Sequence, residues 1–559
     1  MESSAIGRVL GWTAIAATLA ISPWASYDPI NVPKLAVIAV GGLITLAALL
    51  TNAKALFARK HKTVQVLAGL FVLDLILVLI FAGTNPYQEF FGTFGRSTGF
   101  VAYFALTALF LGAVVTASTK LLNSFARTLL IAGGLSIGYG FLQIMGADPF
   151  KWVNQYSPVI GFLGNPNFQS SFVGFSGVLA FGFFIVNDLK INARMAYGAY
   201  LILATFVIYK TDSQQGLLVL AGGIAIVSLI WISRSRLKVL TIPALLVSGV
   251  GAAFVALGSL NSGPLASLLY KASVTYRGDY WRAGWKMTVE QPFLGVGLDS
   301  YGDWYRRTRT LEATLRRGPE VTSNAAHNVL LDFSSNGGFP LVILYLALMM
   351  LVVISAVKLL KRSTGFDPAV AGSIAVWIAY QAQSIISLNQ LGLAVWGWII
   401  SGLIIGYETN TRTQEVVVDD KVAVPKGRNV KKSVSKEMSS KTLMSMFAGG
   451  VIGLLVGLPP FIASAQFKTA LETADAVKIE NAASIWPHEA LRYGQVVLIL
   501  QANKLDAQAQ KVVDAALLQF KDEFGLWSLA AKLSTATPEQ VAEAIAQMKR
   551  LDPNNPEVK

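Results

Sequence analysis

The sequence has no cysteine, only three histidines and few charged residues for its length. The missing cysteines exclude disulfides, thiolate metal sites and a thiol nucleophile. Three dispersed histidines, His61, His327 and His488, argue against a polyhistidine metal site. Charged residues make up 14% of the 559 residues, whereas soluble domains carry about 25%. With 53% hydrophobic residues, the composition excludes an ordinary soluble enzyme, a disordered chain and a fibrous one.

Several nucleotide and metal motifs are also missing. No Walker loop, dinucleotide fingerprint or H-E-x-x-H sequence occurs. The chain therefore shows no sign of hydrolysing nucleotides itself. If it is an enzyme that works outside the cytoplasm, its energy must come from an activated substrate.

Long apolar segments are the main feature that is present. About thirteen of them approach the roughly 20 residues that a spanning helix needs. They predict an all-α polytopic membrane protein. The segments are residues 5–22, 34–51, 64–82, 99–117, 128–146, 167–186, 195–209, 216–232, 239–258, 328–357, 369–387, 391–407 and 442–464.

The basic residues orient these segments. With a cytoplasmic N-terminus, half of the 46 lysines and arginines fall in inner loops, and only a few fall in the short outer loops. The outer loop at residues 259–327 is an exception, because it is long and basic. The net charge of +14 therefore reflects orientation and one outer cluster, and we expect no nucleic-acid partner.

Four parts are predicted along the chain. Residues 1–407 form a core of about twelve spans with the outer loop 259–327. Residues 408–441 form a basic cytoplasmic linker, which is either solvated or in contact with anionic lipid. Residues 442–464 add one span, and residues 465–559 form an outer helical domain. The ending Asp552-Pro-Asn-Asn-Pro-Glu557 is similar to that of a tetratricopeptide unit, which favours protein or glycan contacts; a generic helical tail is the alternative.

The long outer loop carries a helix-like run of arginine and aromatic residues. Arg277, Trp281, Arg282 and Trp285 are spaced so that the two tryptophans share a helix face and Arg282 flanks them. Guanidinium groups suit phosphate oxygens, and aromatic rings suit sugar faces. The run therefore fits a lipid-linked, phosphate-bearing glycan, although an interfacial helix anchored by tryptophan and snorkelling arginine explains it equally well.

Other outer loops add single polar residues. His327 is the one histidine at the outer face of the core, and a neutral imidazole there can accept a proton from a hydroxyl; a histidine satisfied by backbone groups is the alternative. Arg96 lies in a glycine-rich loop, and Lys210 and Gln214 lie in the short polar loop after the seventh span. Asp74 lies within a span and is left out of the candidate site, because a single buried acid is more often structural.

Four segments resemble the O-antigen ligase and O-antigen polymerase family of bacterial lipid-linked glycan transferases. The resemblance spans about residues 80–407. Its segments are Gly164-Asn-Pro-Asn167, the Arg277, Trp281 and Trp285 run, Pro292-Phe-Leu-Gly-Val-Gly297, and Ala326-His-Asn328 followed by Gly337-Gly338.

The resemblance implies a multi-pass glycosyltransferase of the bacterial cytoplasmic membrane, with its active site on the outer side. It implies an undecaprenyl-diphosphate-linked glycan as donor, a hydroxyl on lipid, glycan or protein as acceptor, and no metal or cofactor. Arg277 and His327 would be catalytic, with Arg277 and Arg282 on the diphosphate and His327 on the acceptor hydroxyl. Arg96 would match an outer-loop arginine of the family. A partner protein for the C-terminal domain is a further hypothesis.

One departure from the family pattern concerns the loop after the seventh span. Many members carry an arginine there within a Ser-Arg-Gly-like motif, whereas this chain has Ser213-Gln-Gln-Gly216. Lys210 or Gln214 would then supply the donors. The acceptor is left open between ligase, polymerase and protein glycosyltransferase, and a transporter is the alternative of another class.

Overall fold

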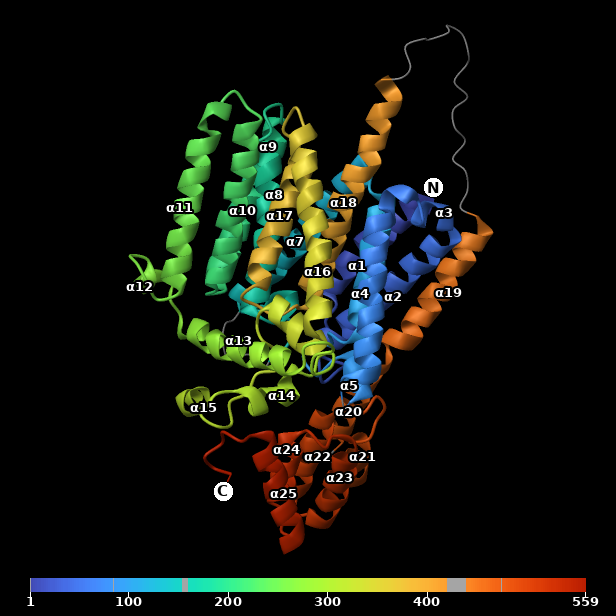
Figure 1. Ribbon diagram of the computed structural model, residues 1–559, viewed down its shortest axis with the longest axis vertical. Coiled ribbons are helices and arrows are strands. Elements are labelled where there is room, and N and C mark those ends of the chain that lie inside the picture. Colours follow the sequence, from blue (N-terminus) through green and yellow to red (C-terminus); the bar gives the residue numbers. More distant parts are fainter. Residues whose placement is uncertain (1, 84, 153–158, 420–438, 474, 559) are drawn as a thin grey trace.

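The computed structural model describes residues 2–83, 85–152, 159–419, 439–473 and 475–558. All regular structure within these ranges is helical, and no strand occurs in them. The predicted all-α class is confirmed. Among the described residues, nine helices are long and apolar enough to cross a membrane, and two further apolar helices are somewhat shorter. Figure 1 shows these helices as an upright bundle.

Every apolar segment predicted from the sequence coincides with a helix. Each of these helices follows from a run of apolar residues that is long enough, or nearly long enough, to span a membrane. The helices are α1 (Glu2–Leu19), α2 (Asn31–Thr51), α4 (Lys62–Phe81), α6 (Phe100–Thr116), α7 (Thr119–Ile144), α8 (Pro166–Phe184), α9 (Ile191–Lys210), α10 (Gln214–Ser233), α11 (Thr241–Ser259), α16 (Val329–Arg362), α17 (Pro368–Ser384), α18 (Leu391–Asp419) and α19 (Ser440–Gly457).

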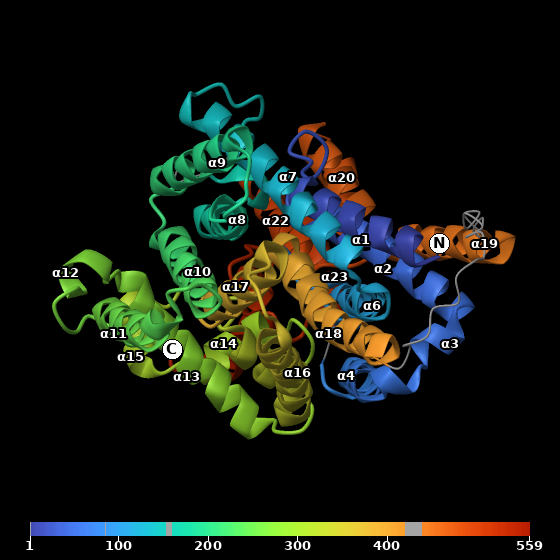
Figure 2. The same cartoon turned by 90° about the horizontal axis from the view of Figure 1, so that it is seen from above.

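Burial differs sharply between helices of similar hydropathy. The apolar part of α18 is 94% buried and supplies the large core side chains Trp396 and Trp398. No residue is buried in the corresponding part of α11, which lies at the edge of the bundle. An apolar helix with so little packed around it is expected to face lipid. Figure 2 shows α18 near the middle of the bundle and α11 at its periphery.

The last apolar helix, α19, packs along α2. A Cβ placed on Gly449, Gly453 or Gly457 would meet its nearest α2 atom at 2.5–2.8 Å, so these glycines allow the close approach. The predicted linker begins inside a helix, since α18 continues to Asp419; residues 420–438 lie outside the described residues. The predicted span 442–464 is divided, because Pro459 begins a second helix, α20 (Pro459–Glu472).

One end of the bundle carries most of the short helices, and we call it the loop face (Figure 1). It holds α5 (Pro86–Phe91), α12 (Ala266–Leu269), α13 (Ala272–Glu290), α14 (Tyr301–Thr308) and α15 (Leu311–Arg317). The loops predicted to lie outside gather here. Lys34, on the inner side of this face, is fully buried. Its Nζ donates to the carbonyls of Ala17, Thr18 and Ala20 at 2.8–3.0 Å and so caps the end of α1.

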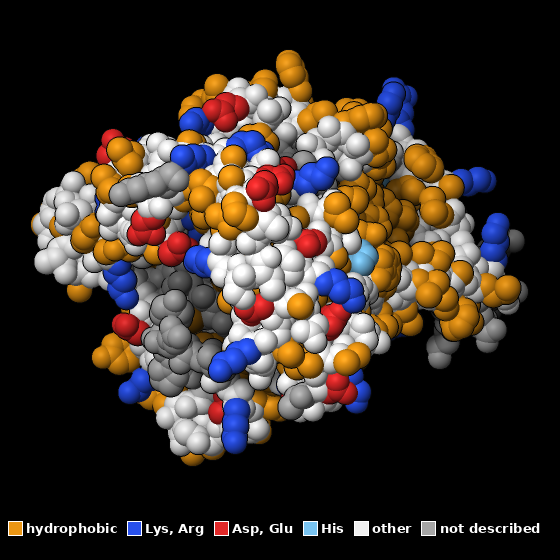
Figure 3. All heavy atoms as spheres, turned by 90° about the horizontal axis from the view of Figure 1, so that it is seen from below, with side chains coloured by type: hydrophobic (Ala, Val, Ile, Leu, Met, Phe, Trp, Pro, Cys, Tyr) orange, Lys and Arg blue, Asp and Glu red, His pale blue; other side chains and the backbone are white. Residues whose placement is uncertain are grey.

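The C-terminal domain covers the loop face. It consists of α20 followed by α21 (Ala476–Ala482), α22 (Ala490–Ala502), α23 (Asp506–Gln519), α24 (Phe524–Ala530) and α25 (Pro538–Leu551). Its own apolar core includes Phe467, Tyr493 and Val513. Seen from below, charged side chains of both signs are spread over this face, and hydrophobic side chains gather toward the end where α19 lies (Figure 3).

Candidate functional site

The helix α13 places most of the predicted site residues along the loop face. Its beginning lies at the loop between α9 and α10, because Lys271 Nζ donates to the Asp212 carbonyl at 3.1 Å. Its inner side packs Tyr280, Ala283 and Met287 into a small core with α14. The predicted helix is therefore present, with one buried side and one exposed side.

His327 occupies a left-handed backbone conformation with φ of +52°, which is uncommon for a residue other than glycine. Both neighbours hold it there. The Ala326 N–H donates to Asp332 Oδ1 at 2.8 Å, and the Asn328 side chain accepts from the N–H groups of Leu330 and Leu331 at the start of α16. The backbone of His327 is thus held at a helix start by contacts of the residues on either side.

Arg96 lies in the interior behind this segment. Its Nε is 3.2 Å from Asp299 Oδ1, one terminal nitrogen is 3.5 Å from Asp332 Oδ2, and the other donates to the Asn324 carbonyl at 2.7 Å. Only 2% of its side chain is exposed. Arg96 therefore ties the loop at residues 92–99 to the loop at residues 297–300 and to the segment that carries His327. Its predicted contact with substrate remains a prediction.

Aromatic and cationic side chains surround the imidazole. The ring of Tyr280 stacks on His327 with centroids 5.3 Å apart and planes 27° apart. Arg317 lies over the rings of Tyr276 and Tyr280 and also donates to the Tyr280 hydroxyl. Burial, followed by the charges of Arg277, Arg96 and Arg317, lowers the pKa of His327 to about 4. The imidazole is neutral at neutral pH, so one ring nitrogen is free to accept a proton.

The arginines of the long loop divide into paired and unpaired groups. Arg282 and Arg316 both contact Asp279, at 3.0 and 2.8 Å. Among the described residues, neither Arg277 nor Arg317 has a carboxylate partner. Burial lowers the pKa of Arg277, although an arginine remains charged at neutral pH. These two guanidinium groups and the neutral imidazole of His327 are an arrangement that can bind an anion beside a proton acceptor.

The two predicted tryptophans differ in their surroundings. Trp285 is 54% exposed and contacts Phe339 edge-to-face, with ring centroids 6.0 Å apart. Trp281 is half-buried, and its indole Nε1 is buried without a partner in the structure. Arg282, next to Trp281, has 61% of its side chain exposed. Trp285 and Arg282 are thus open to a ligand at the surface.

Lys210 and Gln214 lie at the beginning of α13. Gln214 donates to the Leu268 carbonyl at 2.8 Å, and Lys210 Nζ lies 5.6 Å from the Phe206 ring. No described contact joins either residue to His327 or Arg277. Because Lys271, which touches this loop, is six residues before Arg277, about 9 Å of helix separates the two regions. Arg277 lies close enough to His327 for its charge to lower the pKa of the imidazole, whereas Lys210 and Gln214 lie at the edge of the site.

Two of the segments that carried the family resemblance pack directly on each other. The helix α16 is broken at Gly338, with φ of +70°, just before Pro340. The freed carbonyls of Ser335 and Asn336 accept the N–H groups of Val296 and Gly297, at 2.8 and 3.2 Å. The Pro292-Phe-Leu-Gly-Val-Gly297 segment thus satisfies the backbone of the broken helix and fixes the start of α16 next to His327.

The Gly164-Asn-Pro-Asn167 segment forms a helix start. Gly164 has φ of +70°, and the Asn165 side chain accepts from the Asn167 N–H at the beginning of α8. Asn167 in turn accepts from the Ser213 hydroxyl at 2.7 Å. The segment therefore positions the α9–α10 loop rather than facing His327.

Sequence reasoning missed Tyr280, Arg317 and Asp299 as residues of this site. Tyr280 stood inside the arginine and aromatic run but was not singled out. Arg317 follows Arg316, and nothing in the sequence distinguishes the unpaired arginine from the paired one. The contact of Asp299 with Arg96 joins residues about 200 positions apart, so no local pattern reveals it.

The fold and the site define a polytopic helical membrane protein with a cationic, histidine-bearing loop face. A model of the family described as O-antigen ligase matches residues 199–346, about a quarter of the chain. This stretch runs from α9 into α16 and includes α13 and His327, so the similarity to the O-antigen ligase family covers the region of the candidate site. The match supports an O-antigen ligase-like membrane glycosyltransferase. Comparison with curated proteins gives no match.

Proposed function

We propose that this protein transfers a glycan from an undecaprenyl-diphosphate carrier to a hydroxyl acceptor at the outer face of the bacterial cytoplasmic membrane. The observation that carries this proposal is the neutral imidazole of His327 beside two guanidinium groups, Arg277 and Arg317, that have no carboxylate partner among the described residues. The loop face is the outer side in this proposal, because the basic loops predicted to be cytoplasmic join the opposite ends of the helices.

The proposed reaction is a single displacement. The acceptor oxygen forms a bond to the anomeric carbon, and the bond between that carbon and the diphosphate oxygen breaks. His327 accepts the proton of the acceptor hydroxyl, and the lipid diphosphate leaves with the bonding electrons. Arg277 and Arg317 stabilise the charge that develops on the diphosphate, without a metal ion in the proposal.

The remaining predicted residues have supporting roles in this proposal. Arg96 acts as a positioning residue through Asp332, which holds the Ala326 N–H next to His327. Trp285 and Arg282 bind the part of the donor that lies at the membrane surface. Trp281 lies on the same helix, α13, and binds the same part of the donor. Lys210 and Gln214 contact the carrier lipid at the beginning of α13.

The test is glycan transfer by the purified protein in lipid nanodiscs with a lipid-linked donor. We expect Arg277→Ala and His327→Ala to lose transfer while the protein stays folded. Arg236→Ala, an exposed arginine at the other end of the bundle, is the matched control and should transfer normally. Normal transfer by both site variants would contradict the proposal, and vectorial glycan movement without a new glycosidic bond would favour a transporter.

The acceptor needs a separate experiment, because ligases, polymerases and protein glycosyltransferases of this family share the same chemistry. Deletion of the gene, followed by analysis of surface glycoconjugates, identifies the class. Loss of glycan from lipid A core indicates a ligase, shortened chains indicate a polymerase, and loss of glycan from a protein indicates a protein O-oligosaccharyltransferase.

A further inference from the structure

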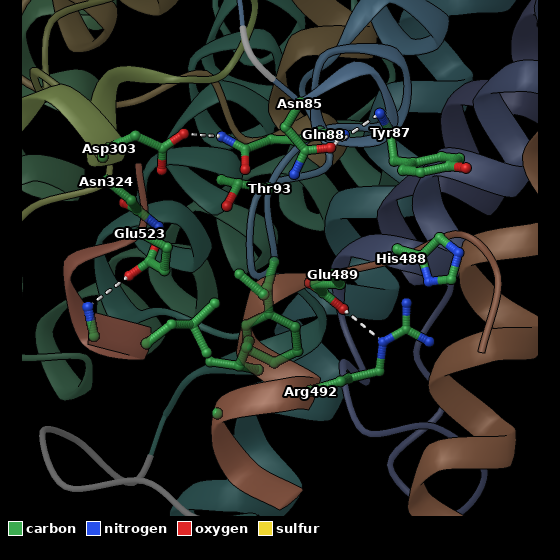
Figure 4. Close-up of a pocket in the computed structure, with 18 of the residues that line it drawn as sticks. Asn85, Tyr87, Gln88, Thr93, Asp303, Asn324, His488, Glu489, Arg492 and Glu523 are labelled. Carbon is green, nitrogen blue, oxygen red and sulfur yellow. Dashed lines mark hydrogen bonds and ion pairs between the residues drawn. The ribbon is translucent and has the colours of Figure 1, made fainter. Parts of the chain in front are cut away.

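A cavity of about 600 Å³ lies between the C-terminal domain and the loop face, within the range of small-ligand sites. No residue of the candidate site around His327 lines it. Its walls come from the segment around α5, from α14 with residues 322–324, and from the C-terminal domain around α22 and α24. Figure 4 shows side chains from these separate segments pointing toward one space.

The helix α14 separates this cavity from His327. Tyr301 and Tyr305 face the small core that includes Tyr280, the ring stacked on His327. Asp303 and Arg306, on another face of the same helix, line the cavity. Since a helix is about 10 Å across, a ligand in the cavity would lie within a few sugar units of the imidazole.

Carboxyl groups outnumber basic groups in the cavity wall. Asp303 accepts from Gln88 at 2.9 Å, while Glu489 keeps 31% of its side chain accessible although protein surrounds it. Burial raises the pKa of Glu489 to about 7, and burial together with the charge of Glu523 raises the pKa of Asp303 well above its usual range. Such a wall disfavours a phosphate and suits hydroxyl or amine donors.

An unpartnered donor also lies in this wall. Arg492 is only 3% exposed, and its Nη1 has no hydrogen-bond partner in the structure. Its Nε lies 3.4 Å from Glu489, and Figure 4 shows the guanidinium close to His488. A buried N–H without a partner is unfavourable, so a ligand oxygen at this position would complete its hydrogen bonding.

Amides and aromatic rings complete the wall. Asn85, Gln88 and Gln495 offer donors and acceptors, and the Tyr87 ring meets His488 edge-to-face at 5.2 Å between centroids. Phe524 adds an apolar face. Carboxyl and amide groups that alternate with aromatic rings suit a ligand with many hydroxyl groups and apolar ring faces.

We propose that this cavity binds an unphosphorylated oligosaccharide, the part of a glycan that lies away from the bond being formed. The proposal rests on the proposed function, because the glycan is a substrate of the site around His327. Two sources share this chemistry. One is the acceptor glycan, and the other is the distal part of the donor glycan.

Binding is tested on the full-length protein in nanodiscs by hydrogen–deuterium exchange. The probes are tetrasaccharides of glucose, N-acetylglucosamine, glucosamine and N-acetylglucosamine 6-phosphate. We expect an unphosphorylated probe to protect residues 85–97 and 487–498. Leu498→Trp, which fills the cavity from a half-exposed position, should abolish this protection. The same change at Leu518, 77% exposed and outside the cavity, should leave it intact.

Three results would overturn the proposal. They are no protection by any probe, equal protection in Leu498→Trp, and protection by the phosphorylated probe alone. Because the binding readout needs no turnover, it decides the inference even if the protein transfers no glycan and the proposed function fails.

Transfer kinetics then separate the two sources. If acceptor sugars occupy the cavity, Leu498→Trp raises the KM for acceptor about tenfold with little change in kcat or in the KM for donor. If donor sugars occupy it, the KM for donor rises instead. Unchanged KM values for both substrates would overturn the proposal.

Discussion

The Asp552 carboxylate and the Arg309 guanidinium form a 2.5 Å ion pair in which neither side chain is more than 1% exposed. Arg306 also reaches Asp552 at 3.0 Å, so one carboxylate at the end of the C-terminal domain holds two arginines of the long loop. The repeat-like ending noted in the sequence is therefore one of the points where that domain docks on the loop face, together with the Arg307–Asp522 ion pair.

Asp552→Asn should weaken this docking strongly. The substitution leaves two arginines close together without their shared carboxylate. Because breaking a buried ion pair typically costs about 3–5 kcal/mol, we expect the free energy of unfolding to fall by about that amount. Thermal unfolding in detergent, with hydrogen exchange of residues 301–317, measures the effect. Glu543→Gln, an exposed acid on the same domain, is the control. Unchanged exchange in both variants would contradict the anchoring role.

Arg317→Ala should lower kcat for glycan transfer by about 10²–10³, as expected for the loss of one group that stabilises a leaving oxyanion. Arg316→Ala is a matched control from the same helix, because Arg316 pairs with Asp279 and Arg282 continues to pair with it. Single-turnover rates with a lipid-linked donor distinguish the two. Equal effects in both variants would indicate that Arg317 has no special role.

The kcat/KM of transfer should stay level from neutral pH downward and fall as the pH passes through about 4, where His327 becomes protonated and can no longer accept a proton. The unfolded-state pKa of histidine is about 6.5, so the stability from the neutral, buried ring is complete above that pH and decreases as the pH falls toward 4. Titration of labelled histidine by NMR checks the pKa. A value near 6.5 would show that the ring is solvated.

Gly338→Ala should destabilise the loop face by about 1–3 kcal/mol. The residue has φ of +70°, and a Cβ there would lie 2.6 Å from the Phe293 backbone carbon, so the broken helix would separate from the Pro292 segment. Gly365→Ala is the control, because a Cβ at Gly365 meets nothing within 4 Å. Gly338→Ala should unfold at lower denaturant concentration and transfer less glycan than Gly365→Ala. Similar values for the two variants would contradict the role given to the backbone conformation of Gly338.

The bundle could be predicted from the sequence because lipid leaves little choice for a long apolar run, as α11 and α18 show. The same pattern could not distinguish the unburied α11 from the central α18, since both are apolar and differ only in how much protein packs around them. Pro459, rather than any change in hydropathy, divides the final predicted span.

The candidate site could be predicted only in part. The long loop stood out because it is long and basic for an outer loop, and His327 stood out because it is the one histidine at the outer face of the predicted core. Arg96 is likewise an arginine in an outer loop, but its guanidinium forms ion pairs inside the protein. The sequence does not reveal these pairs, because Asp299 and Asp332 come close to Arg96 only after folding. The cavity had no sequence signal, since its walls come from segments far apart in the chain.

The docking of Asp552 gives the protein an order of completion during synthesis. The segments that fix His327 are all translated once α16 has been made, whereas the cavity wall also includes residues between 487 and 529, in the domain that Asp552 ties to the loop face. A nascent chain therefore acquires its proposed catalytic groups before its proposed glycan cavity. Docking of the segment around Asp552, rather than membrane insertion of α16, is the step at which this protein would become able to hold a long glycan.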